Sequence, residues 1–154
     1  MSSSFRNLTL GGCLLATTLG ISSAHAAIFV NLANQQQSEC LSVFFGGDGS
    51  QAFLSPCTAS FSQMWNWEEI EIRGLGTTNL ALKCLDVRGA GTANNTPVQL
   101  FTCNGTVAQR WFYTASGQIL NPPSGKCLDL SGFEGQVVIV TCDLSKLSQQ
   151  WAIQ

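Results

Sequence analysis

The chain has 154 residues, of which 45% are hydrophobic and only 10% are charged, with seven basic side chains against nine acidic ones. This composition is typical of a compact fold and argues against disorder. The formal net charge of −2 excludes the strongly basic surface that a nucleic-acid-binding protein needs.

Residues 1–26 have the pattern of a secretory signal peptide. Arg6 supplies the positive start, residues 8–21 a short apolar stretch, and Ala24-His25-Ala26 a small-x-small cleavage site. The stretch is too short and too interrupted by Gly and Thr to anchor the chain in a membrane, and no other segment could span a bilayer. We therefore expect a secreted protein, extracellular or periplasmic, with a single domain over residues 27–154.

Cleavage would remove the only histidine, His25, together with Cys13. Six basic and nine acidic side chains would remain, a net charge of −3. Without histidine, neither a Ser-His nor a Cys-His nucleophile can form, and zinc sites of the histidine type are excluded. The remaining cysteines are 17, 19 and 15 residues apart within successive pairs, so no Cys-x2-Cys metal knuckle occurs, and we expect no metal and no cofactor.

Short apolar runs alternate with turn residues along the rest of the chain. Runs of this length at roughly ten-residue spacing predict an all-β sandwich or barrel. Turns are predicted at 46–49, 89–91 and 121–125, which are rich in Gly, Asn and Pro. The predicted strands lie in 28–32, 41–45, 52–54, 65–72, 80–87, 97–101, 111–113, 118–120, 127–130 and 137–141.

One short pattern occurs three times: Cys-Leu, a second Cys, then Gln-x-Trp. The first cysteines are 44 and 43 residues apart, which indicates one supersecondary unit copied twice and packed around a shared core. In an oxidising compartment six cysteines indicate disulfides, and the repeat selects one pairing of the 15 possible, with one bond inside each copy. The pairs are Cys40–Cys57 in copy one, Cys84–Cys103 in copy two and Cys127–Cys142 in copy three.

Cys-Leu-Asp-Val, Gln-Leu-aromatic-x-Cys and Gln-x-Trp in tandem copies resemble the ricin B-type lectin family, over nearly all of residues 27–154. The resemblance implies a β-trefoil of twelve strands, four per copy, and a carbohydrate-binding function without catalysis. It also implies a galactose-type glycan or glycoconjugate as the partner. We expect the Gln-x-Trp residues to be mainly architectural, with Trp65, Trp111 and Trp151 in the core.

In this family a sugar site combines the Asp of Cys-Leu-Asp, an aromatic residue two positions before the second Cys, and polar side chains that include the Gln of Gln-x-Trp. Copy two has the complete set: Asp86, Gln99, Phe101 and Gln109. A carboxylate accepts charge-assisted hydrogen bonds from adjacent hydroxyls, while an aromatic plane covers the C–H face of a pyranose. Copy two departs from the family at Ala108, where an Asn is common.

The other two copies are incomplete. Copy three keeps Asp129, a weaker candidate, but has Val138 and Val140 at the amide and aromatic positions. Copy one has Ser42 in place of the Asp, with Phe53 and Ser55 at the other two positions, and is expected to be framework.

Phe44-Phe45 and Phe133 could form an apolar surface for a protein partner, but we expect them to be buried under the barrel cap.

Three alternatives remain open. The chain could be a partner-binding or cell-targeting subunit of a secreted toxin or enzyme assembly, or a trefoil protease inhibitor. An enzyme is the least favoured reading, because Glu68, Glu69 and Glu71 form the only acidic cluster. On one strand Glu69 and Glu71 would share a face, and a solvated sheet edge explains them better.

Two glycosylation sequons begin at Asn94 and Asn104.

Overall fold

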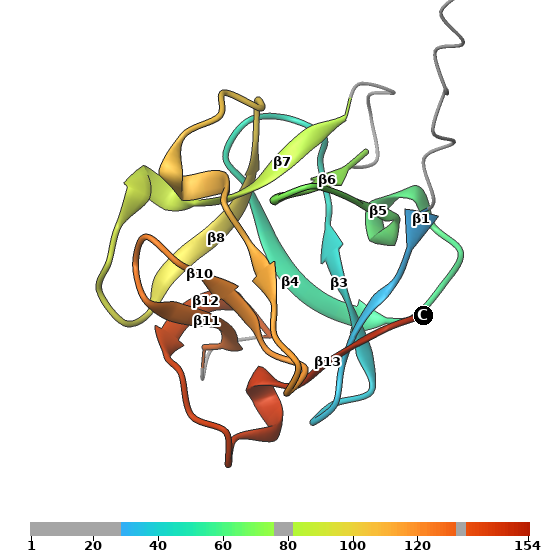
Figure 1. The fold of residues 1–154 in the computed structure, drawn as a ribbon. Coiled ribbons are helices and arrows are strands. Elements are labelled where there is room, and N and C mark those ends of the chain that lie inside the picture. Colours follow the sequence, from blue (N-terminus) through green and yellow to red (C-terminus); the bar gives the residue numbers. More distant parts are fainter. Residues whose placement is uncertain (1–28, 76–81, 132–134) are drawn as a thin grey trace, which may run out of the picture.

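The structure, a computed structural model, describes residues 29–75, 82–131 and 135–154 (Figure 1). The expected signal peptide, with Cys13 and His25, and Phe133 lie outside these residues. The described part contains β-strands and short 3-10 helices, and within it no helix is long and apolar enough to cross a membrane.

Each copy contributes a similar series of elements. Copy one contains β1 (Phe29–Val30), β2 (Leu32–Asn34), β3 (Glu39–Val43), β4 (Ser50–Pro56), η1 (Phe61–Gln63) and β5 (Trp65–Glu68). Copy two contains β6 (Glu71–Gly74), β7 (Lys83–Val87), η2 (Arg88–Ala90), β8 (Thr96–Phe101), η3 (Val107–Gln109) and β9 (Phe112–Tyr113). Copy three contains β10 (Ile119–Asn121), β11 (Lys126–Leu130), β12 (Val137–Thr141), η4 (Leu147–Gln149) and β13 (Trp151–Ile153).

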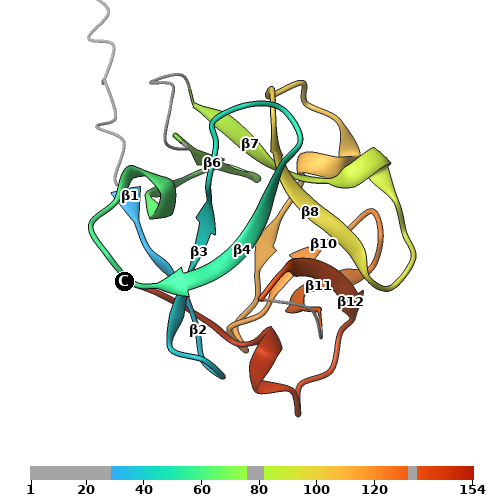
Figure 2. The same cartoon turned by 180° about the vertical axis from the view of Figure 1, so that it is seen from behind.

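All strand pairs are antiparallel, and three of them join successive copies: β5–β6, β9–β10 and β13–β2. The last of these brings the C-terminal strand back to the start of the fold, as both views of the ribbon show (Figures 1 and 2). The sheet therefore closes, as expected for a β-trefoil, and leaves few strand edges unpaired.

The described residues form thirteen strands instead of twelve, because the first strand is divided at Asn31. Before this residue β1 pairs with β5, and after it β2 pairs with β13. Asn31 itself exchanges backbone hydrogen bonds with Gln154, at 2.8 and 2.9 Å. The division marks the point where the chain changes its partner strand.

Within each copy the middle strands form a hairpin: β3–β4, β7–β8 and β11–β12. The hairpins also touch one another, because β8 pairs with both β4 and β12 and a bridge joins Phe53 to Gln136. Alternate residues face the core, so Leu41, Leu85 and Leu128 lie opposite Leu54, Leu100 and Ile139 in equivalent registers. The residues between them face away from this core and are free to build a site.

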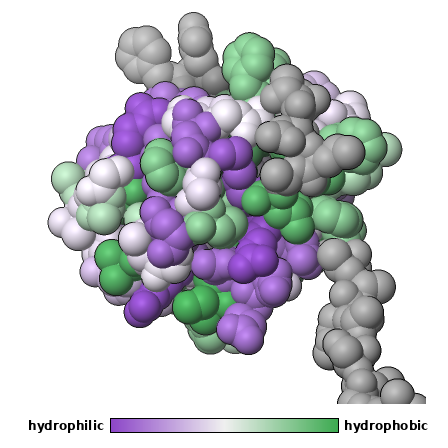
Figure 3. Space-filling model, turned by 90° about the horizontal axis from the view of Figure 1, so that it is seen from above, coloured by the Kyte–Doolittle hydropathy of each residue, from purple (hydrophilic) through white to green (hydrophobic). Residues whose placement is uncertain are grey.

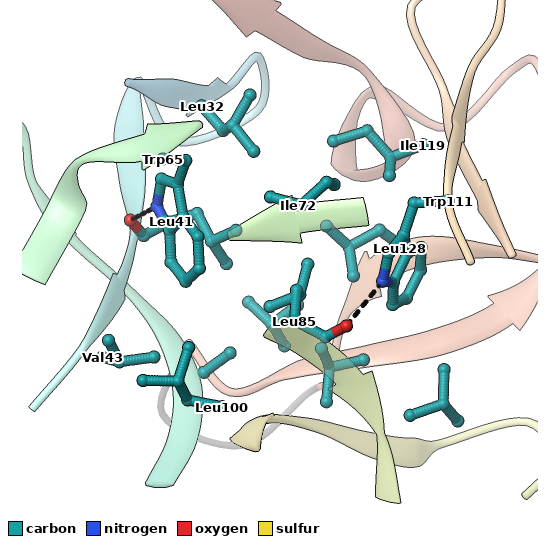
Figure 4. Close-up of a cluster of buried hydrophobic side chains, with 14 of the residues drawn as sticks. Leu32, Leu41, Val43, Trp65, Ile72, Leu85, Leu100, Trp111, Ile119 and Leu128 are labelled. Atoms are coloured by element: carbon teal, nitrogen blue, oxygen red, sulfur yellow. Dashed lines mark hydrogen bonds between the residues drawn. The ribbon is translucent and has the colours of Figure 1, made fainter. Parts of the chain in front are cut away.

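The three Gln-x-Trp tryptophans lie in the core, each 1% exposed. Each indole Nε1 donates to the backbone oxygen of the leucine in the Cys-Leu pair of its own copy: Trp65 to Leu41 over 2.9 Å, Trp111 to Leu85 over 2.8 Å and Trp151 to Leu128 over 3.2 Å. Figure 4 shows the first two of these bonds among the packed aliphatic side chains. The tryptophans thus tie the hairpin of each copy to the barrel.

Disulfides join Cys40 to Cys57, Cys84 to Cys103 and Cys127 to Cys142, one inside each copy, which is the pairing that the repeat predicts. Disulfide-rich small domains are typical of oxidising compartments. Each bond holds the loop that carries the Gln-x-Trp segment against its hairpin.

Candidate functional site

The β7–β8 hairpin places the copy-two candidates side by side. Asp86 lies directly opposite Gln99 in the register, and Cys84 lies opposite Phe101. Because successive residues of a strand alternate between faces, these four share the face turned away from Leu85 and Leu100. The apolar residues that point into the core therefore aim the polar ones at a common patch.

The side chains of three of the four predicted site residues are joined by hydrogen bonds. Gln99 Nε2 donates to Asp86 Oδ1 over 2.9 Å, and Gln109 Nε2 donates to Asp86 Oδ2 over 3.1 Å. Asp86 is 5% exposed and Gln99 is 6% exposed, so the carboxylate is held at the base of the patch with a small opening to solvent. Each carboxylate oxygen accepts one bond from these amides and retains a further lone-pair direction.

Gln109 lies beneath Asp86 and does not reach the surface, with 0% exposure. It also donates to the backbone oxygen of Thr102 over 3.0 Å and accepts from the backbone N–H of Asn104 over 2.9 Å. Its amide is therefore fully used in orienting Asp86 and the loop behind the second cysteine. These contacts suit a residue that positions Asp86, as the architectural interpretation of Gln-x-Trp predicts, and the direct sugar contact expected of Gln109 stays a prediction.

Phe101 is half-buried at the end of β8. Its register partner Cys84 is bonded to Cys103, so a disulfide flanks the aromatic residue. Ala108, where the family often has Asn, is 5% exposed and offers no polar group beside the patch.

Burial raises the pKa of the Asp86 carboxyl, and the negative charge of Asp48 adds a smaller effect in the same direction. The hydrogen bonds from Gln99 and Gln109 act the other way, since they stabilise the ionised form. The net result is a carboxylate that takes up a proton more readily than an exposed aspartate.

Sequence reasoning did not single out Arg88, which follows β7 at the start of η2. Its Nε donates to Gln99 Oε1 over 2.9 Å, and its Nη2 donates to Gln51 Oε1 over 3.2 Å and to the backbone oxygen of Gly49 over 3.4 Å. Gln51 and Gly49 belong to copy one, so the copy-two patch is bordered by a neighbouring copy. The only indication of Arg88 in the sequence is its place, as a charged residue two positions after Asp86.

Copy three holds its aspartate in a more closed arrangement. Asp129 is 2% exposed and lies opposite Val138 in the register. Its Oδ1 accepts from the backbone N–H of Leu130 over 2.7 Å, and its Oδ2 accepts from Gln149 Nε2 over 2.9 Å and lies 3.8 Å from Lys146 Nζ. With valines on the facing strand, this carboxylate has no polar neighbour equivalent to Gln99 there.

In copy one a serine replaces the carboxylate, and the same glutamine network closes around it. Gln63 Nε2 donates to Ser42 Oγ over 2.9 Å and to Ser55 Oγ over 2.7 Å. Phe53 lies opposite Ser42 and stacks on Phe44 with ring centroids 4.1 Å apart. Phe53 of copy one therefore occupies the strand position that Gln99 occupies in copy two.

The expected burial of Phe44 and Phe45 under the cap is wrong, because they are 65% and 66% exposed. The strand β3 ends at Val43, so both rings lie in the following loop and escape the core. In the face drawn in Figure 3, hydrophobic side chains form small groups among hydrophilic ones.

The acidic cluster near residue 69 does not lie on one strand. Glu69 has a φ of 54° in the turn between β5 and β6, and Glu68 pairs across that turn with Glu71. Arg73 Nη1 and Nη2 contact Glu68 and Glu71, each over 2.6 Å, so the two carboxylates share one guanidinium. Within the described ranges Glu71 also lies near Cys84 and Cys103, but these sulfurs form a disulfide and are not free to bind a metal.

A separate hollow of about 660 Å³ lies between the β9–β10 turn and η4, away from Asp86. Tyr113, Gly117, Leu144, Leu147 and Gln150 are among its lining residues. It contains none of the predicted site residues.

The model of the ricin-type β-trefoil lectin domain matches residues 28–151. The chain belongs to this family. Its strands, closed sheet and threefold organisation agree with the fold, and carbohydrate binding is the activity by which the family is named.

Among curated proteins, the chain is 27% identical over 139 residues to polypeptide N-acetylgalactosaminyltransferase 10 of Mus musculus, covering 84% of this chain and 22% of the transferase. It is 40% identical over 68 residues to the probable lipoprotein EnvE of Salmonella typhimurium, covering 42% of this chain and 39% of that protein. Among solved structures, the agglutinin from Abrus precatorius superposes with a TM-score of 0.70 at 24% identity, covering 87% of this chain and 51% of the agglutinin. The chain thus spans only part of each of these proteins.

Proposed function

We propose that this chain is a secreted, non-catalytic lectin that binds a galactose-type glycan through copy two. The observation that carries the proposal is the register of the β7–β8 hairpin, which places Asp86, Gln99 and Phe101 on one face with the carboxylate anchored from below by Gln109. Copy two alone combines the acid, the amide and the aromatic residue.

The chemistry follows from what these groups offer. A carboxylate that already accepts one bond per oxygen can accept two more from adjacent sugar hydroxyls, in charge-assisted bonds stronger than neutral ones. Phe101 supplies an apolar plane for the C–H face of the ring. Fixing Asp86 in advance lowers the ordering cost that a flexible side chain would add to binding.

A single shallow site of this kind is expected to bind a monosaccharide with a Kd of about 1 mM, or about −4 kcal/mol. Tighter binding would come from several sites acting together on a dense glycan surface.

A protein-partner function is the second candidate, and the exposed rings of Phe44 and Phe45 favour it. Exposed aromatic residues are enriched at protein interfaces. In that case the chain would serve as a targeting module of a larger assembly.

A glycan array tests the proposal, with galactose and N-acetylgalactosamine glycosides among the probes. The variants are Asp86→Ala and, as a matched control in the equivalent place, Asp129→Ala. We expect binding that disappears in Asp86→Ala and persists in folded Asp129→Ala. Binding lost only in Asp129→Ala would move the site to copy three, and no binding by folded wild-type protein would favour a protein partner.

A further inference from the structure

The position that follows the Cys-Leu-x-Val/Leu segment differs sharply among the three copies. It is Phe44 in copy one, Arg88 in copy two and Ser131 in copy three. A cation is therefore present at this position only beside the copy that has the complete sugar-binding set.

Arg88 is held by neutral groups alone. Its three hydrogen-bond acceptors are the side-chain oxygens of Gln99 and Gln51 and the backbone oxygen of Gly49. Within the described part of the chain it takes part in none of the four ion pairs, whereas the nearby Lys83 is paired with Asp48 over 2.6 Å. The residue is exposed, so its charge is accessible from solvent.

These contacts also fix the direction of the guanidinium. Nε and Nη2 are used, and Nη1 takes part in none of the three bonds. An arginine immobilised in this way loses little further side-chain freedom when it binds an anion.

Arg88 and Asp86 are linked through a single amide group. Arg88 Nε donates to Gln99 Oε1, and Gln99 Nε2 donates to Asp86 Oδ1. Two hydrogen bonds and one amide span about 8 Å at most, which is comparable with the width of a substituted sugar ring. A sugar seated on Asp86 would thus have a substituent within reach of the guanidinium.

We propose that Arg88 is a specificity-determining residue and that the copy-two site prefers an acidic sugar, one that carries a carboxylate or a sulfate next to the hydroxyls bound by Asp86. The inference rests on the proposed function, since it needs a sugar on Asp86. Nη1 of Arg88, which takes part in none of the three bonds, can donate to a carboxylate or sulfate oxygen in a charge-assisted bond.

The test compares three probes by calorimetric titration: methyl galactoside, galacturonic acid and galactose 6-sulfate. We expect wild-type protein to bind at least one acidic probe about tenfold more tightly than the neutral one, equivalent to about 1.4 kcal/mol. The advantage should shrink in high salt, because the site is exposed. The acidic probe whose affinity exceeds that of methyl galactoside by the larger factor identifies the preferred anion.

Arg88→Ala should abolish the preference while retaining neutral-sugar binding. Arg88→Lys should keep only part of it, because a lysine keeps the charge but cannot make all the bonds to Gln99, Gln51 and Gly49 that fix the direction of Arg88. Arg110→Ala, which removes an exposed arginine of the same copy, is the charge-matched control and should leave the preference intact. Thermal unfolding checks that each variant is folded.

Equal affinity of wild-type protein for neutral and acidic probes would overturn the inference, as would a preference that survives in Arg88→Ala. Neutral binding that depends on Asp86 but shows no acidic preference would leave the proposed function standing. Absence of binding to all three probes and across the array would overturn both.

Discussion

Asp48 in copy one and Asn94 in copy two make the same contact with the copy that follows each of them. Both lie nine residues before the second cysteine of their own copy. Asp48 Oδ1 accepts from the backbone N–H of Thr102 over 2.7 Å, and Asn94 Oδ1 accepts from the backbone N–H of Thr141 over 2.9 Å. The contact joins neighbouring copies, and in the first case it borders the candidate site.

Asp48→Asn should retain the bond to Thr102 and lose the ion pair with Lys83. The hydrogen bond from Lys83 lowers the pKa of Asp48 in the folded protein, so its contribution to stability is present above the unfolded pKa and is lost as pH falls through the folded one. Because Asp48 is 40% exposed, the loss at neutral pH should be below about 1 kcal/mol. Denaturant unfolding at neutral and strongly acidic pH measures it.

Asn94→Asp is the reverse substitution and should add a small stabilisation at neutral pH through Lys126, whose Nζ lies 3.2 Å from Thr141 Oγ1. An Asp48→Asn effect that stays constant down to strongly acidic pH would contradict the ion-pair explanation.

Gln109→Ala should destabilise the fold by about 2–4 kcal/mol, because it removes a fully buried amide that bonds the buried Asp86 carboxylate and the backbone of Thr102 and Asn104. Sugar affinity should also fall in the protein that remains folded, since Asp86 loses its anchor. Gln150→Ala, which removes a half-buried glutamine next to the equivalent Gln149, is the control and should cost less than about 1 kcal/mol. Equal losses in the two variants would argue against the positioning role.

Sugar binding should weaken on acidification at a pH above that expected for an exposed aspartate. Burial raises the pKa of Asp86, and only the ionised carboxylate accepts bonds from two hydroxyls at full strength. Because the pKa of Asp86 is raised in the folded protein, the free energy of unfolding falls as the pH rises through that pKa. The affinity for the sugar increases over the same range. Calorimetric titration from below the ordinary pKa of an aspartate up to neutral pH, with unfolding followed in parallel, measures both trends. Affinity that is constant over this range would show that Asp86 does not accept from the ligand.

Trp111→Phe should lower the free energy of unfolding by about 2–4 kcal/mol, since it removes the buried bond to Leu85 and leaves a cavity. Trp65→Phe and Trp151→Phe should cost similar amounts, because each indole makes the equivalent bond. Denaturant unfolding provides the values. A loss confined to one variant would mean that the three tryptophans are not equivalent in energy.

The spacing of the repeat was sufficient to predict three copies packed around one core and the one-bond-per-copy disulfide pairing, and the resemblance to the ricin B-type lectin family implied the trefoil. The resemblance also singled out copy two as the one with an acid, an amide and an aromatic residue at the family's site positions, and the structure places these residues on one hairpin face. The sequence could not predict the thirteenth strand, because the division of the first strand at Asn31 depends on pairing with Gln154 at the other end of the chain.

The details that depend on tertiary contacts also escaped prediction. Phe44 and Phe45 continue an apolar run, and nothing local shows that β3 ends at Val43. Glu68 and Glu71 lie in one run of the sequence, but the turn at Glu69 sets them on facing strands. The role of Arg88 depends on acceptors from two different copies.

The most direct test of a sugar site in copy two is an NMR titration of the folded, oxidised protein with the best glycan from the array. We expect the largest amide shifts to centre on Asp86, Gln99 and Phe101, and Asp86→Asn to remove them while the protein stays folded. Shifts centred on Asp129, on the Phe44–Phe45 loop or on the hollow beside Leu147 would contradict it.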